Sequence, residues 1–503
     1  MVGCDKLTVT HLGALRRKYG TAGAAQVRAA LEALSKADHD RGLSSHLLLL
    51  DNASTAKSLK LPKVADGDWA AALRFVDRAA AKYVPSYIVL VGSTDVVPQA
   101  RLSNPLNGIS GDTDRHLPSD LPYACDLPDA WSGSSNTLLN PSSLLSVTRV
   151  VGRIPDQVGA SDPAFLLKVL KTATSYKKHS ATTYQKVFAL TATAWKGSTT
   201  TSVDLLPGPA PVTNLSPPKT SGWTKTELKP RIHFVNCHGG DTTPDWFGQL
   251  DSNAPVDTVA LSPEDIDDRI TAGTVVAAEC CYGAMHQDPA DLGGRLPMMW
   301  AYLGSGAYAG IGSSTTAYGP ADGNGQADLI CRYVLEGIMT GSSTGRALLD
   351  ARQRYIRELG ALGPEDLKTL GQFDLLGDPS LQPVNVPGRP KQVVPKGGGP
   401  AAGLVQRRAV LRAAGRALGA TVPRASSSPS RRSDVTAQEL AAEAGLSPNT
   451  VTGSARTFSE GHGTPRAGYR FHVAPVRSAG RDGLVISHEA YGQRETSTIW
   501  RKG

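Results

Sequence analysis

The sequence predicts an α/β fold, a three-layer sandwich around a mostly parallel sheet, followed by a small C-terminal α+β domain. Strand-like and helix-like patterns alternate through the first 380 residues. The strand-like runs are apolar on both faces, which is typical of parallel strands covered by helices on each side. After Asp378-Pro-Ser-Leu381 the pattern changes to a segment rich in Pro, Gly and Lys, which marks the end of this body.

The elements follow from local periodicity. Helices are predicted where apolar residues recur on one stripe, at Gln26–Ala37, Trp69–Tyr83, Pro163–Lys177 and Gln326–Met339. Short buried strands are predicted at His46–Leu50, Tyr87–Val91, Val147–Val151, Val187–Thr191, Arg231–Asn236, Val275–Glu279 and Gly306–Ile311.

Four regions result from these patterns. We expect an N-terminal α/β subdomain over residues 1–155 and a second subdomain, with the candidate site, over 156–382. A basic Pro/Gly/Ser-rich linker is expected over 383–433, and it includes a basic helical segment, Leu404–Leu418. An accessory domain is expected over 434–503, with a helix at Asp434–Phe458 and strands at Tyr469–Val473, Leu484–Ser487 and Ser497–Trp500.

Composition and charge indicate in which compartment the protein is expected to work. Residues 401–503 contain 15 Lys and Arg against 7 Asp and Glu, which accounts for the whole net charge of +8 and leaves residues 1–400 neutral. Six irregularly spaced cysteines do not suggest a disulfide framework. The N-terminus has no apolar signal-like stretch, and the chain has no long apolar run. We therefore expect a cytoplasmic protein that does not enter a membrane.

Two predicted strands end at reactive side chains followed by glycine. The run Ile232–Asn236 leads to Cys237-His238-Gly239-Gly240, and the run Val275–Glu279 leads to Cys280-Cys281-Tyr282-Gly283. In a parallel sheet such side chains lie at the carboxyl edge, where ligands bind. A thiol beside an imidazole can perform nucleophilic acyl transfer.

Two other interpretations compete with catalysis. Buried cysteines often act only as small hydrophobic residues, although this does not explain Glu279 at the end of an apolar run. A zinc site would use Cys237, His238, Cys280 and Cys281 as ligands. These are two pairs of adjacent residues, and adjacent residues on a strand point to opposite faces, so they are badly placed to bind one ion. We therefore expect no metal and no cofactor.

Five blocks, in order, resemble the gingipain-like cysteine peptidases, within the caspase, legumain and clostripain group. The blocks are Tyr87–Pro98, Ser119–Ala124 with Val151–Pro155, Cys237-His238-Gly239, Ile311–Pro320 and Leu376–Ser380. The resemblance implies a caspase-like fold and a cysteine endopeptidase that uses a Cys-His dyad and a thioester intermediate. A protein or peptide is then the expected substrate, and a regulatory protein partner is also expected.

The nucleophile is one of two adjacent cysteines. The wider group places an acidic or amide residue two positions before its cysteine, which favours Cys281 after Glu279, whereas the glycine spacing of gingipains favours Cys280. Only one of them can face His238, and we favour Cys281. Backbone N–H groups of Gly239 and Cys281 are the expected oxyanion donors.

The resemblance also implies a substrate pocket. Its walls are the loop after Val187–Thr191, with Trp195 and Asp204, and the segment Thr315, Thr316 and Tyr318. A buried Asp204 would select Arg or Lys by charge pairing, so cleavage after basic residues is expected.

The tail resembles a helix-turn-helix. Thr436–Val451 has one helix, Gly445 at the turn and Ser447 as an N-cap. The segment after Val451 offers only Arg456 for base contacts, so we do not expect nucleic-acid binding and favour an accessory domain. The alternative for the whole chain is a catalytically silent caspase-like scaffold whose basic tail binds nucleic acid or protein.

Overall fold

The computed structural model describes most of the chain, in two compact units, Met1–Ala401 and Ala402–Gly503. The described residues are 3–108, 112–127, 131–359, 362–386, 431–432, 436–452, 456–459, 469–478, 481–490 and 493–500. The predicted linker 383–433 falls outside them for residues 387–430 and 433, and the segment Leu404–Leu418 lies wholly outside them.

Strands and helices alternate along the first unit. The strands are β1 (Lys6–Thr10), β2 (Ser45–Leu49), β3 (Tyr87–Val91), β4 (Ala100–Ser103), β5 (His116–Ser119), β6 (Val150–Ile154), β7 (His179–Ser180), β8 (Val187–Ala192), β9 (Thr213–Ser216), β10 (Ile232–Asn236), β11 (Trp246–Gly248), β12 (Thr258–Leu261), β13 (Val275–Ala278), β14 (Ala309–Ser313), β15 (Phe373–Gly377) and β16 (Val384–Asn385). The helices are α1 (Leu12–Asp40), α2 (Ala53–Leu59), α3 (Trp69–Tyr83), α4 (Ala164–Thr174), α5 (Lys196–Asp204), α6 (Pro263–Ile266), α7 (Met298–Gly304), α8 (Gln326–Met339), α9 (Thr344–Leu359) and α10 (Pro364–Gln372).

One large sheet organises this unit. In the described residues it has 10 strands in the order β2-β1-β3-β6-β15-β14-β13-β10-β8-β9. Neighbouring strands are parallel except β14 and β15, which are antiparallel. The strands on the two sides of this junction therefore run in opposite directions, and β8, β10, β13 and β14 end at one common edge. The predicted mostly parallel sheet is confirmed.

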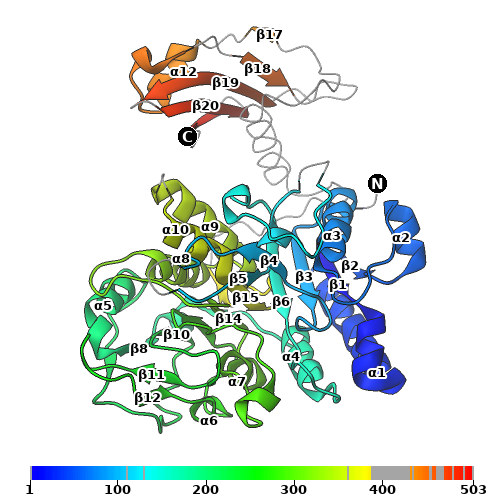
Figure 1. Cartoon of the computed structure of the whole chain (residues 1–503), viewed down its shortest axis with the longest axis vertical. Helices are drawn as coiled ribbons and strands as arrows, with labels where there is room; N and C mark the ends of the chain where they lie inside the picture. The colour runs from blue at the N-terminus through cyan, green and yellow to red at the C-terminus, as the bar shows by residue number, and fades with distance from the viewer. Residues whose placement is uncertain are drawn as a thin grey trace. The chain divides into compact units, whose positions relative to one another are not determined.

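Helices cover both faces of the sheet, which gives three layers (Figure 1). Helices α1, α4 and α7 pack side by side along one face, and α8 packs against α9 and α5 on the other. Strand alternation divides the apolar side chains between the faces: Val235 joins the core beneath α7, whereas Phe234 joins the core beneath α8. Because both faces are covered, the strand residues of β10 and β13 are all buried.

Several boundaries agree with the sequence and others do not. Helices Trp69–Tyr83 and Gln326–Met339 and strand Tyr87–Val91 have the predicted limits. The first helix begins at Leu12, where the side chain of His11 caps it, and ends at Asp40. Gly20, at a φ of 68°, breaks it into two helical segments, and the predicted Gln26–Ala37 lies within the second. Strand Lys6–Thr10 was not predicted, because it begins with a lysine. This lysine is buried against Asp38 and Asp378.

Two of the sequence blocks have structural roles in this unit. Arg153 of β6 donates to both carboxylate oxygens of Asp120 at 2.8 and 2.6 Å, and both side chains are buried. Asp378, in the turn after β15, accepts from Lys6 at 2.5 Å. These ion pairs fasten distant segments to the sheet. The predicted division at residue 155 stays a prediction; the sheet is continuous across it.

The second unit is a small α+β domain, as predicted. It contains β17 (Arg431–Arg432), α12 (Ala437–Glu443), β18 (Arg456–Ser459), β19 (Tyr469–Ser478), β20 (Arg481–Ala490) and β21 (Gln493–Trp500), with the strands paired antiparallel in chain order. The three predicted strands near its end are confirmed. Leu440 of α12 packs with Val476 and Val485 of the sheet.

The helix-turn-helix interpretation and the helix predicted at Asp434–Phe458 are wrong. Thr436 caps α12 in a capping box with Glu439, and Gly445 turns the chain at a φ of 72°, as expected. The second helix, however, is a single 3-10 turn, Pro448–Thr450, and Val451 then pairs with Val476 of β19. Pairing with the sheet takes the backbone groups that a longer helix would have used.

Candidate functional site

The two strand ends singled out in the sequence lie side by side. β10 and β13 are parallel neighbours, and Val235 pairs with Ala278. His238 and Cys281 each follow three residues after this pair, so they lie at the same level of the carboxyl edge. Gly239 is packed so tightly against the second strand end that a Cβ added there would be 2.1 Å from the carbonyl oxygen of Cys281. Only glycine allows this approach.

The two adjacent cysteines have different environments. Cys280 is 0% exposed and belongs to the apolar core on the α7 face, and burial raises the pKa of its thiol well above its usual value. Cys281 is partly exposed. The alternation of strand residues therefore turns Cys281, and not Cys280, to the accessible side.

The thiol of Cys281 contacts the segment after β14. The amide N–H of Ala317 points to Sγ at 3.4 Å, and Sγ lies 3.7 Å from the carbonyl oxygen of Ala317. Burial raises the pKa of this thiol, although the Ala317 hydrogen bond acts in the opposite direction. The thiol is consequently protonated at neutral pH in this conformation.

His238 is held by two side chains that come from different loops. Its Nε2 lies 2.9 Å from Oε1 of Gln249, and the indole of Trp195 lies against the ring with 4.2 Å between centroids. Burial lowers the pKa of His238, and the hydrogen bond to Gln249 partly offsets this. The imidazole is therefore neutral at neutral pH.

Glu279, two residues before Cys281, is buried and lies beneath the edge. Burial raises the pKa of its carboxyl well above the usual value, with a further contribution from the neighbouring Asp328, to which it is hydrogen bonded. Burial also raises the pKa of Asp328, which accepts a hydrogen bond from Ser198. Both carboxyl groups of this buried pair are therefore shifted toward the protonated form.

An acidic loop reaches the segment that contacts the thiol. Asp114, between β4 and β5, accepts from the amide of Thr316 at 3.0 Å and from the hydroxyl of Tyr282 at 2.9 Å. Burial acts to raise the pKa of Asp114, but the hydrogen bonds from Lys368, Thr316 and Tyr282 outweigh it and lower the pKa.

Lys368 of α10 joins two carboxylates of this loop. Its buried ammonium contacts Asp112 and lies 2.8 Å from Asp114. Asp112 also accepts from the hydroxyl of Tyr318 at 2.7 Å. The segment Thr316–Tyr318, which borders Cys281, is thus anchored by a network of two acids, one ammonium and two phenols.

The residues predicted to form the substrate pocket do not all lie at the site. Trp195 packs against His238, and Thr316 and Tyr318 flank Ala317, the residue that contacts the thiol of Cys281. Thr315 is buried with its hydroxyl bonded to Gln372, so its side chain points into the core. Asp204 is exposed at the last residue of α5. The burial on which charge selection by Asp204 depends is missing, so that expectation is corrected.

Sequence reasoning missed Gln249, Asp112, Asp114 and Lys368. A glutamine after a short strand carries no signal of its own, and acidic residues in a long loop usually remain solvated. Lys368 has an unremarkable helical context, and only tertiary structure places it beside Asp112 and Asp114. The two closely spaced acidic residues Asp112 and Asp114 are the one feature of the sequence that could have indicated a charged loop near the site.

The amides expected to stabilise an oxyanion are at the same edge. Within the described residues, neither the Gly239 nor the Cys281 amide donates to another residue. Neighbouring amides are engaged, since His238 donates to Phe247 and Tyr282 donates to Thr315. Two backbone donors at adjacent strand ends can bind a developing negative charge.

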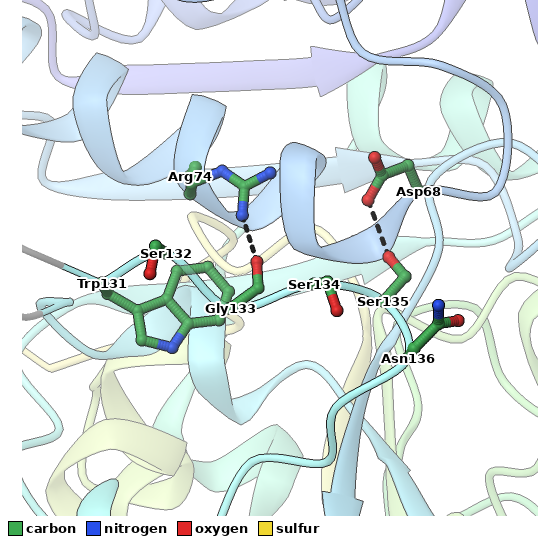
Figure 2. A pocket seen from close by; sticks show the side chains of 8 residues that line it. All are labelled: Asp68, Arg74, Trp131, Ser132, Gly133, Ser134, Ser135 and Asn136. Carbon is green, nitrogen blue, oxygen red and sulfur yellow. Dashed lines mark hydrogen bonds between the residues drawn. The ribbon is translucent and has the colours of Figure 1, made fainter.

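A separate cavity lies between α3 and the loop 131–136 (Figure 2). It measures about 520 Å³ and none of the predicted site residues line it. Its two charged groups are already paired: Asp68 accepts from Ser135 at 2.7 Å, and Arg74 donates to the carbonyl of Gly133 (Figure 2). These contacts order the loop on α3, and no reactive group lies there.

The described residues contain neither a metal-binding cluster nor a membrane-spanning helix. No group of three or more His, Cys, Asp or Glu in that part of the chain could hold a metal ion. None of its helices is long and apolar enough to cross a membrane. All six cysteines are free thiols.

Comparison with known protein families gave no match, and comparison with curated protein sequences gave none either. Among solved structures, the chain is similar to the complex of Porphyromonas gingivalis RgpB pro- and mature domains, with 11% identity, a TM-score of 0.49 and coverage of 99% of this chain and 100% of that chain. It is also similar to two structures of the Saccharomyces cerevisiae separase–securin complex, with 13% and 11% identity and TM-scores of 0.31 and 0.30. Each covers 47% of this chain and 14% of the other.

Proposed function

We propose that this protein is a cysteine endopeptidase of caspase-like fold, with Cys281 as the nucleophile and His238 as the general base and acid. The observation that carries the proposal is the placement of these two side chains at one level on adjacent parallel strands, with Gly239 packed on Cys281. A thiol, an imidazole and two free amides at one edge are the groups that acyl transfer needs.

The reaction divides into two steps. The thiol proton of Cys281 passes to His238 as sulfur attacks the substrate carbonyl carbon, and the Gly239 and Cys281 amides bind the oxyanion. The imidazolium then gives the proton to the leaving amine as the C–N bond breaks, which leaves a thioester. Water, deprotonated by His238, hydrolyses the thioester and restores the thiol.

The resting state is a neutral thiol beside a neutral imidazole. The pKa of Cys281 is raised and that of His238 is lowered, in both cases chiefly by burial. Since the thiol is also bonded to Ala317, a substrate has to displace the Thr316–Tyr318 segment from it. A nucleophile that is protonated and bonded to a neighbouring segment at rest is consistent with activation by a regulatory partner.

A preference for basic residues is supported by Asp112 and Asp114 rather than by Asp204. These two carboxylates and the single ammonium of Lys368 leave one negative charge beside the segment that borders Cys281. Tyr318 bonded to Asp112 adds an aromatic surface at the same place. A substrate side chain with a cationic end would be attracted there.

The second candidate is a catalytically silent scaffold of the same fold. The protonated thiol of Cys281, bonded to Ala317, favours it. In that case the strand ends would have a structural role, and the edge would bind a protein without cleaving it.

Probe labelling separates the two. The full-length chain is incubated with acyloxymethyl-ketone probes that carry basic, acidic or apolar residues, with and without calcium, and with a peptide library. The peptidase proposal expects labelling by the basic probe and cleavage of library peptides, and both should be lost in Cys281→Ala and His238→Ala. Absence of labelling and cleavage under every condition would favour the scaffold.

Cys280→Ala is the matched control. It removes the adjacent thiol, which faces the core and not the site. Labelling that persists in Cys280→Ala and disappears in Cys281→Ala would assign the nucleophile. The reverse pattern would contradict the assignment to Cys281.

A further inference from the structure

We propose that Gln249 is the positioning residue of the catalytic pair: it holds His238 in the tautomer that has the proton on Nε2 and the lone pair on Nδ1. This inference rests on the proposed peptidase function. Gln249 follows β11, a short strand outside the main sheet, and its side chain reaches His238 across a local chain reversal.

The hydrogen bonds around Gln249 fix the direction of its amide. The amide Nε2 donates to the carbonyl oxygen of Ala254 at 2.9 Å. The amide oxygen Oε1 therefore faces His238, 2.9 Å from the imidazole Nε2. Since Oε1 can only accept, the ring nitrogen that faces it has to donate.

The tautomer follows from that donation. A neutral imidazole has one N–H and one lone pair, so a proton on Nε2 leaves Nδ1 as the accepting nitrogen. Nδ1 is then the atom that can take the thiol proton of Cys281 and later return it to the leaving amine. Without an acceptor at Nε2, both tautomers would be populated. The molecules with the proton on Nδ1 would then have no lone pair there to take the thiol proton.

The backbone of the same segment reinforces the arrangement. His238 and Phe247 exchange backbone hydrogen bonds of 2.9 and 2.8 Å, and the carbonyl of Gln249 accepts from Ala194, the neighbour of Trp195. The backbone N–H of Gln249 also donates to the carbonyl oxygen of Ser216 at 3.0 Å. Gln249, which bonds the ring at Nε2, and Trp195, which packs against the ring, are thereby linked to each other.

A neutral amide has an advantage over a carboxylate in this position. Glutamine orients the ring without adding a negative charge, so burial keeps the pKa of His238 low and the imidazole is available as a base at neutral pH. A carboxylate would stabilise the imidazolium and withdraw the base. This predicts opposite effects for two substitutions of one residue.

The test is NMR of the full-length chain with histidine labelled by ¹⁵N and ¹³C, alongside peptidase assays. His238, assigned by its loss in His238→Ala, should be the Nε2–H tautomer and should titrate below its ordinary pKa of 6.5. Gln249→Glu should raise that pKa by about one unit, the size expected for a close opposite charge. Gln249→Leu should give a mixture of tautomers and lower the pKa.

Peptidase activity supplies a second readout. In Gln249→Glu the acid limb of the kcat/KM profile should move up in pH with the His238 pKa, while Gln249→Leu should lose at least about tenfold in kcat because the base is misoriented. The matched control is Gln382→Glu, the same change at a glutamine that bonds Lys178 and Gly341. It should leave tautomer, pKa and profile unchanged.

The outcomes distinguish this inference from the function on which it rests. An Nδ1–H tautomer in the unaltered protein, or an unchanged tautomer and pKa in Gln249→Leu, would overturn the role of Gln249 even if Cys281→Ala abolishes cleavage. The expected NMR shifts in a protein that cleaves no peptide and reacts with no probe would support the contact and refute the peptidase.

Discussion

A methyl group at Gly239 would lie 2.1 Å from the carbonyl oxygen of Cys281, a distance that no two such atoms can keep. The contact joins the residue after the candidate base to the candidate nucleophile. It also explains why glycine follows His238, since any other residue would push the two strand ends apart.

We therefore expect Gly239→Ala to disrupt the site more than the fold. Relief of the overlap should cost about 1–3 kcal/mol of stability, as overpacking does, and a displacement near 1 Å should lower probe labelling about a hundredfold. Thermal unfolding and labelling of the same preparation would measure both effects. Gly240→Ala is the matched control, because a Cβ added there would meet the methyl of the Thr243 side chain at 2.9 Å and no backbone atom within 4 Å. Equal labelling in the two variants would contradict the proposed packing role.

The alkylation rate of Cys281 should report its protonation. Since burial raises the pKa of this thiol and only the thiolate reacts, the rate with iodoacetamide should climb about tenfold per pH unit between pH 6 and 8. Site-resolved mass spectrometry separates Cys281 from the other five thiols. A rate already constant at pH 6 would instead indicate a thiolate–imidazolium pair.

Asp114→Asn should make that thiol more reactive. The negative charge of Asp114 raises the pKa of Cys281, and its carboxylate holds Thr316 in the segment bonded to the thiol. Removal of the charge should speed alkylation at pH 7.4 by roughly twofold to tenfold, since one pKa unit corresponds to a tenfold change. The exposed Asp322→Asn is the control. A slower reaction in Asp114→Asn would show that Lys368, left with one partner, has reorganised the site.

Much of the fold followed from local signals, and the exceptions are instructive. Strands such as Tyr87–Val91 could be predicted because both faces are buried and their residues are all apolar. β1 could not, because Lys6 reads as a polar residue until Asp38 and Asp378 are brought to it from distant parts of the chain. The antiparallel β15 is equally hidden, since the sequence of a short buried strand does not state its direction.

The candidate site divides in the same way. His238 and Cys281 could be found because strand, reactive residue and glycine are consecutive in the sequence. Choosing Cys281 over Cys280 needed the direction of a side chain, which alternation suggests and burial shows. Gln249 and Asp114 approach from other segments, by chain reversals that leave no local pattern. The error at Asp204 has the same origin, because a sequence position near a strand end does not decide burial.

The buried pair Arg153 and Asp120 should matter greatly for stability. Arg153→Met leaves Asp120 as a buried charge without its partner, which typically costs about 3–5 kcal/mol. Arg28→Met is the control: Arg28 pairs with Glu32 on the exposed surface of α1, where a pair contributes at most about 0.5 kcal/mol. Urea unfolding of the full-length chain, followed by tryptophan fluorescence, measures both. A loss below about 1 kcal/mol in Arg153→Met would mean that Asp120 finds another donor.

Glu279→Gln should stabilise the protein at neutral pH. The pKa of Glu279 is raised in the folded protein, so folding above the ordinary pKa of 4.5 requires a proton to be taken up. Its contribution to stability is complete below pH 4.5 and is lost as the pH rises toward the folded pKa, at about 1.4 kcal/mol for each unit. Glutamine resembles the protonated acid and avoids this loss.

The unfolding temperature of Glu279→Gln should therefore exceed that of the unaltered protein at pH 8, and the difference should shrink toward pH 5. The exposed Glu32→Gln should show no such pH dependence. A Glu279→Gln protein that is less stable at pH 8 would mean that Glu279 is ionised in the folded state and that its pairing with Asp328 does not hold a proton.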